Sequence, residues 1–136
     1  MNDHLYKTET AKTPDQFAKD LEKVVTDNGL MVGNAETMDM AKTFTAHGAD
    51  VPGEFDVFMV QICNPGKAAM SMNANPERSI LMPKFVMVFS RDGKTQIRFF
   101  YYSAETIRAM VDDDVFPGSL AQTYEKIISM IDEAAA

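Results

Sequence analysis

Apolar residues recur at helical spacing near the start of the chain. Phe17, Leu21 and Val25 fall four positions apart, which places them on one face of a helix. Thr13 precedes this stripe as a capping residue, a proline follows at the first helical position, and Gly29 can end the helix. The spacing therefore predicts an amphipathic helix over residues 13–28.

A second apolar stripe predicts a longer helix at the end of the chain. It begins at about Ser119, after the turn signal Pro117-Gly118. Its apolar face carries Leu120, Tyr124, Ile127, Ile128 and Ile131. We expect shorter helices at about residues 38–44, 64–75 and 103–111.

The segments between these helices have the composition of strands. They are short runs rich in β-branched and aromatic residues. Asp92-Gly93 is a strong turn signal that predicts a hairpin between the last two runs. Pro83 interrupts the fourth run and cannot donate a ladder hydrogen bond, so we expect an edge or a bulge there. The expected strands span residues 4–11, 30–32, 55–62, 79–89 and 95–102.

This order of elements predicts an α+β fold, with an antiparallel sheet and helices packed on one face. The 136 residues are enough for a single domain, which we take to span residues 1–136. The last strand, residues 97–102, is so rich in aromatic residues that both of its faces need a cover. A partner subunit is one such cover, and we expect a homodimer.

Charge and composition exclude several classes of function. A net charge of −7 argues against nucleic acid and anionic membranes as partners. The only cysteine cannot form an internal disulfide, and no apolar run approaches the roughly 20 residues of a membrane span. We expect a soluble cytoplasmic protein, with the periplasm as the alternative if a leader has been removed.

The candidate site lies where the third strand meets the next helix. The strand runs up to Cys63, Asn64 can cap the following helix and Pro65 can open it. A thiol at a helix N-terminus lies near the positive end of the helix dipole. Pro83 and Lys84 belong to the following strand, and an ammonium group beside the thiol would favour the thiolate and attract anions. Against this, a free cysteine is often a buried structural residue.

At Cys63-Asn64-Pro65, Ala68 to Met70 and Leu81-Met82-Pro83, the chain resembles the bacterial domain-of-unknown-function family 302 (DUF302). The resemblance runs from Thr13 to Leu120. It implies a TATA-binding-protein-like fold and a homodimer, and it implies no activity. Members commonly carry a second cysteine after the proline, where this chain has Lys84. A two-thiol redox pair or shared metal is therefore not expected.

We therefore expect a non-catalytic binding or accessory module, with no catalytic residue, no cofactor and no resident metal. The ligand-binding residues predicted are Cys63, Asn64, Pro65, Pro83 and Lys84, and the ligand is a small anion or a sulfur-bearing group. Two alternatives remain. Cys63 and the 11 methionines, among them the Met70-Ser71-Met72 pair, are soft ligands that suit copper, and the thiol could instead carry sulfur. The acidic run Asp112 to Asp114 is expected to be a solvated helix end.

Overall fold

Five antiparallel strands form one sheet in the computed structural model, which describes residues 4–136. The strand order is β1-β5-β4-β3-β2, and each neighbouring pair is antiparallel. The fold is therefore α+β, as predicted from the order of elements. The strands are β1 Leu5–Thr10, β2 Met31–Val32, β3 Phe58–Cys63, β4 Phe85–Arg91 and β5 Lys94–Phe100.

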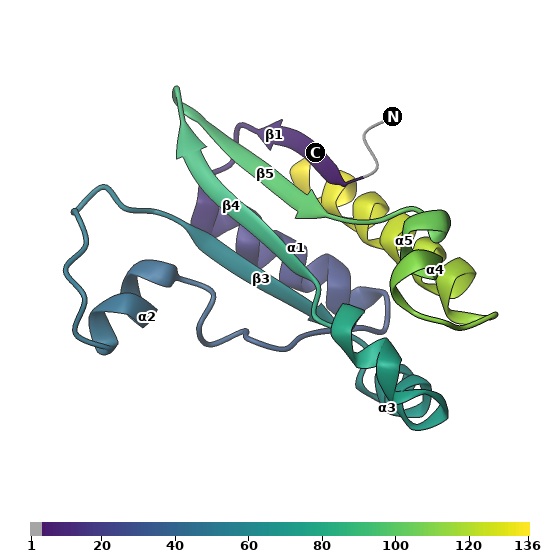
Figure 1. Ribbon diagram of the computed structural model, residues 1–136. Coiled ribbons are helices and arrows are strands. Elements are labelled where there is room, and N and C mark those ends of the chain that lie inside the picture. The colour runs from purple at the N-terminus through teal and green to yellow at the C-terminus, as the bar shows by residue number, and fades with distance from the viewer. Residues whose placement is uncertain (1–3) are drawn as a thin grey trace.

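Two long helices cover one face of this sheet (Figure 1). They are α1 and α5, which also pack against each other. The shorter helices lie at the ends and edges of the sheet, with α3 projecting from the end where β3 stops (Figure 1). The helices are α1 Pro14–Asp27, α2 Met40–Ala46, α3 Pro65–Ala74, the 3-10 helix η1 Pro76–Leu81, α4 Ala104–Met110 and α5 Phe116–Ala135.

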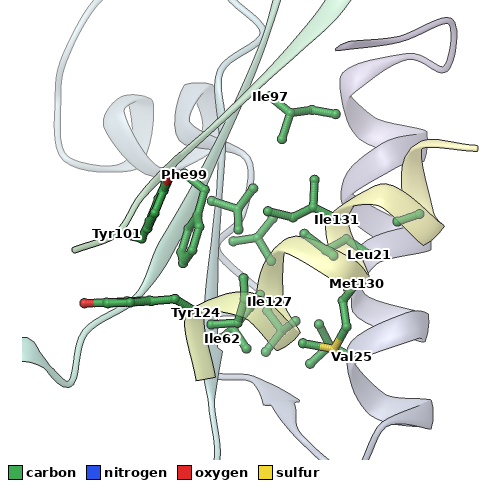
Figure 2. Packing of buried hydrophobic residues seen from close by; sticks show 14 of the residues in the cluster. Leu21, Val25, Ile62, Ile97, Phe99, Tyr101, Tyr124, Ile127, Met130 and Ile131 are labelled. Atoms are coloured by element: carbon green, nitrogen blue, oxygen red, sulfur yellow. The ribbon is translucent and has the colours of Figure 1, made fainter. Parts of the chain in front are cut away.

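The core lies between the sheet and these two long helices. Figure 2 shows Leu21 and Val25 of α1 meeting Ile127 and Ile131 of α5 beside the strand residue Ile97. All five are fully buried, which explains the apolar spacing in both helices. Each helix is therefore held mainly by its buried stripe, since most of a helix's stability in a protein comes from packing its apolar face.

The opposite face of the sheet has no helix layer, and we call it the open face. Its side chains alternate with the buried ones along each strand. Strand register aligns Met59, Met87, Arg98 and Lys7 in one row across four strands. Phe100, in the next row, is 64% exposed. A face of mixed apolar and charged side chains, without a helix layer, is thus part of the fold.

The fourth strand is shorter than the sequence pattern suggested. Residues 79–81 belong to η1, and β4 begins only at Phe85. Asn75 caps η1 by accepting a hydrogen bond from the backbone N–H of Glu77 (3.1 Å), and Pro76 opens it. Because Pro83 cannot donate to a ladder, pairing starts two residues after it. The prediction of a strand over 79–89 with a proline inside it was wrong.

The last helix starts earlier than expected. It begins at Phe116, so Pro117 lies inside its first turn instead of in a preceding turn. A proline is tolerated there because the first N–H groups of a helix have no intrahelical partner. Within residues 4–136, no helix combines the length and apolar character that crossing a membrane requires.

Candidate functional site

Cys63 is the last residue of β3, and its side chain is half-buried. Asn64 follows as the cap of α3, where its side-chain oxygen accepts a hydrogen bond from the backbone N–H of Lys67 (3.2 Å). Pro65 is the first residue of α3. The strand-to-helix junction predicted from the sequence is therefore present. It places Cys63 directly before the N-cap of α3.

Lys84 lies directly across from the end of β3. The backbone N–H of Ile62 donates to the carbonyl of Lys84 (3.0 Å), which fixes the position of the lysine beside the strand end. The Lys84 side chain is half-buried, and its Nζ donates to the carbonyl oxygen of Met82 (2.9 Å). An ammonium group has three donors, so two remain for other acceptors.

These residues border one cavity of about 260 Å³. Of the five predicted site residues, Cys63, Asn64, Pro83 and Lys84 line it, and Pro65 does not. Pro65 contributes only by starting the helix whose side chains do. The cavity lies between α3, the N-terminal part of α5, the end of β3 and the segment 82–84 that precedes β4.

The electrostatics of the cavity are set by lysines. Burial lowers the pKa of Lys84, the nearby Cys63 thiol raises it, and Lys67 lowers it. Lys67 also lines the cavity. Among residues 4–136 neither lysine forms an ion pair with a carboxylate. The cavity therefore holds two ammonium groups without a protein counter-ion, which favours an anionic occupant.

Several lining residues were not singled out from the sequence. Lys67 stands three residues after the cap, on the first turn of α3. Phe116, Leu120, Thr123 and Ile127 come from α5, some fifty residues further along the chain. Lys67 could have been found by asking which side chains share the first turn with the cap. No local signal identifies the α5 residues, because only packing brings that helix to the strand ends.

The acidic run before α5 holds an ion pair that the sequence did not predict. Arg78 of η1 donates from Nε to a carboxylate oxygen of Asp113 (2.7 Å) and from Nη2 to the other (3.1 Å). The side chains of these residues are only 14% and 6% exposed. Asp113 also accepts from the backbone N–H of Phe116 (2.7 Å) and from Asn75 (2.9 Å). The prediction of a solvated helix end was therefore wrong for Asp113, although Asp112 and Asp114 are exposed.

The pair connects two walls of the cavity. Asp113 caps the start of α5, and Arg78 follows directly after α3, where it also donates to the Ser71 hydroxyl (3.1 Å). These charge-assisted hydrogen bonds hold the Asp113 pKa well below its ordinary value. They join η1 and the end of α3 to the start of α5.

The methionines divide between several environments. Met38 and Met130 are buried in the core, and Met59 and Met87 lie on the open face. The exposed methionines are Met31, Met70 and Met110. Met72 and Met82 line the cavity together with Cys63. No cluster of three or more His, Cys, Asp or Glu side chains suited to a metal occurs in the described part of the chain.

Comparison with known proteins assigns the chain to a family. The sequence matches the family described as "Domain of unknown function DUF302" over residues 6–134. The chain belongs to this family. This confirms the resemblance to DUF302 that the motifs around Cys63 and Pro83 indicated. The function of the family is unknown.

The fold is similar to that of a solved DUF302 protein. This is the crystal structure of the uncharacterized conserved protein DUF302 from Bacillus stearothermophilus, which is 18% identical, with a TM-score of 0.71. The similarity covers 97% of this chain and 98% of that one. No curated protein matches the sequence. At this identity the likeness establishes the fold alone.

Proposed function

We propose that this DUF302 protein is a non-catalytic binding module whose cavity takes a small anionic or sulfur-bearing ligand. One observation carries the proposal: Lys84 and Lys67 border the same cavity as Cys63, and neither has a carboxylate partner in residues 4–136. A half-buried ammonium without a counter-ion is costly. An anion in the cavity would offset that cost.

Two further features favour an anion. The cavity borders the N-terminal end of α3, where the helix dipole is positive. Lys84 has two donors left after its hydrogen bond to Met82. The half-buried Cys63 thiol beside these groups can contact a sulfur-bearing ligand or respond to its presence. No carboxylate or histidine lines the cavity, so its titratable groups are Cys63, Lys67 and Lys84.

The proposal is tested by titrating the protein with acetate, phosphate and thiosulfate by calorimetry. We expect at least one of them to bind, and Lys84→Met to weaken its affinity about tenfold or more, because a hydrogen bond to a charged group is lost. Lys126→Met is the matched control, since Lys126 is exposed on α5 and does not line the cavity.

The single thiol gives an independent readout. Alkylation by iodoacetamide reports only on Cys63, because the chain has no other cysteine. Bound anion should slow alkylation in the natural protein and in Lys126→Met. If no anion binds, or if Lys84→Met binds every anion as tightly as the natural protein does, the cavity is not the binding site.

A copper-carrying role is the second candidate, because Cys63, Met72 and Met82 line one cavity and offer three sulfur ligands. Met70, predicted to pair with Met72, is 76% exposed and does not line it. The two ammonium groups oppose a bound cation. Elemental analysis after Cu(I) addition under reducing conditions tests whether the protein binds copper. Stoichiometric copper that Cys63→Ser abolishes would favour this role over anion binding.

We further propose that the open face binds a second copy of the chain. It exposes Phe100 beside partly exposed Met59 and Met87, an apolar patch of a kind that usually marks an interface. The same face carries Arg98 and, one row away, Glu9, so the face has both signs of charge. Two copies related by a two-fold axis can therefore be complementary.

Light scattering tests this arrangement. We expect twice the mass of one chain in dilute buffer, and Phe100→Glu should reduce it to that of one chain. Val115→Glu is the control, because Val115 is equally prominent at 68% exposed but lies before α5, away from the open face. A single-chain mass for the natural protein would contradict the proposal.

A further inference from the structure

The cavity near Cys63 has two chemically different ends. The polar end carries Lys67, Asn64 and Lys84, which are exposed or half-buried. The apolar end carries Leu30, Met72 and Met82, whose side chains are partly exposed and form an apolar wall. Core residues such as Leu120 and Ile127 also border the cavity, but at most 3% of their surface is accessible. A charged head and an apolar tail would each find a matching surface.

Two of the hydroxyl groups that line the cavity, those of Thr123 and Ser71, already have partners. Thr123 donates to the carbonyl of Ser119 in its own helix (3.1 Å), and the Ser71 hydroxyl accepts from Arg78 (3.1 Å). They therefore place little demand on a ligand for hydrogen bonds. An apolar group can lie beside them without leaving a buried polar atom unsatisfied.

The volume limits the size of the occupant. A water molecule takes up about 30 Å³ in the liquid. A cavity of about 260 Å³ therefore has room for roughly nine non-hydrogen atoms. A carboxylate with six to eight carbons has about that number, whereas acetate or phosphate would leave most of the apolar wall in contact with water.

We infer that the ligand class of this cavity is a short-chain carboxylate or similar amphiphilic anion, with its head on Lys84 and Lys67 and its tail against Leu30, Met72 and Met82. This rests on the proposed anion-binding function and specifies its ligand. A purely inorganic anion would not use the apolar wall, and an uncharged apolar molecule would leave the Lys84 ammonium group without a counter-ion.

A ladder of straight-chain carboxylates tests the inference. Affinity for acetate, butanoate, hexanoate, octanoate and decanoate is measured by calorimetry at concentrations below micelle formation. We expect affinity to rise about fourfold for each added methylene as far as octanoate, and then to level off or fall. Hexan-1-ol and hexylammonium should bind at least tenfold more weakly than hexanoate, because they lack the negative head.

A matched pair of variants tests the location of the tail. Ala68 lines the cavity from α3, whereas its neighbour Ala69 is exposed and does not. Ala68→Phe should abolish the gain from butanoate to octanoate and leave acetate binding unchanged. Ala69→Phe should leave the whole ladder unchanged. If Ala68→Phe fails to fold, the carboxylate series is measured on the natural protein and on Lys84→Met. The dependence of affinity on chain length in these two proteins then tests the inference.

The outcomes separate this inference from the proposed function. If small anions bind in a Lys84-dependent way but affinity does not increase with chain length, the tail site is refuted and anion binding stands. If affinity increases with chain length equally in Lys84→Met, the carboxylates bind elsewhere, such as the open face, and the inference is refuted. If none of the carboxylates or inorganic anions binds, both proposals fail.

Discussion

Replacing Asn64 by alanine removes the side-chain cap of α3, the helix that forms one wall of the cavity. In the folded protein the Asn64 oxygen accepts from the backbone N–H of Lys67 (3.2 Å), which would otherwise have no protein partner. Thr13 caps α1 in the same way, by accepting from the N–H of Gln16 (3.1 Å). The two caps make the same kind of hydrogen bond, but the two helices differ in how many of their residues are buried.

The expected effects follow from how each helix is packed. Loss of a capping side chain costs about 1 kcal/mol of helix stability, with a range of roughly 0.5 to 2. Helix α1 carries Phe17, Leu21 and Val25 in the core, so it unfolds only with the whole protein. Helix α3 has no buried residue, so it can open while the core stays folded.

Thr13→Ala should therefore lower the global free energy of unfolding by about 1 kcal/mol in urea. Asn64→Ala should change it by less than about half that amount. It should instead speed amide hydrogen exchange within residues 65–74 about fivefold, which is the population change that 1 kcal/mol produces. Exchange in α1 and α5 serves as the internal control for Asn64→Ala.

If Asn64→Ala lowers the global free energy of unfolding as much as Thr13→Ala does, α3 unfolds together with the core. The view of α3 as a separately opening wall is then wrong. Unchanged exchange in α3 would show that the cap does not stabilise it. An Asn64→Asp variant should restore protection, because aspartate is an equally good cap.

Two further predictions concern charged groups around the cavity. Burial lowers the pKa of Lys84, so the charged lysine destabilises the folded protein at neutral pH. Lys84→Met should raise the free energy of unfolding in urea at pH 7, and the gain should shrink as the pH rises toward the unfolded value of 10.5; a loss of stability would contradict this. Asp113 has a lowered pKa, so its stabilising effect is complete above its unfolded value of 3.8 and is lost as the pH falls further. Asp113→Asn should therefore flatten the acid decline in stability between pH 4 and pH 2, and an unchanged slope would mean that the pair with Arg78 does not stabilise the folded protein.

Much of the secondary structure and part of the site could be predicted from the local sequence. Thr13 and Asn64 were recognisable as caps because a polar cap followed by proline needs no tertiary context. Cys63 was correctly placed at a strand end for the same reason. The strand expected over 79–89 was wrong because an apolar run is compatible with both a strand and a short helix, and Asn75 and Pro76 favour the helix.

The α+β class, the two amphipathic helices and the junction at Cys63 could be predicted from the chain alone, because these depend on neighbouring residues and on periodicity. Three features became visible only in the folded protein: Lys67 joins Lys84 at one cavity, α5 borders that cavity, and Asp113 pairs with Arg78 instead of facing water. Those contacts join residues that are distant in sequence. They arise when helices pack on a sheet, and no local pattern of hydrophobicity or charge specifies which surfaces then meet.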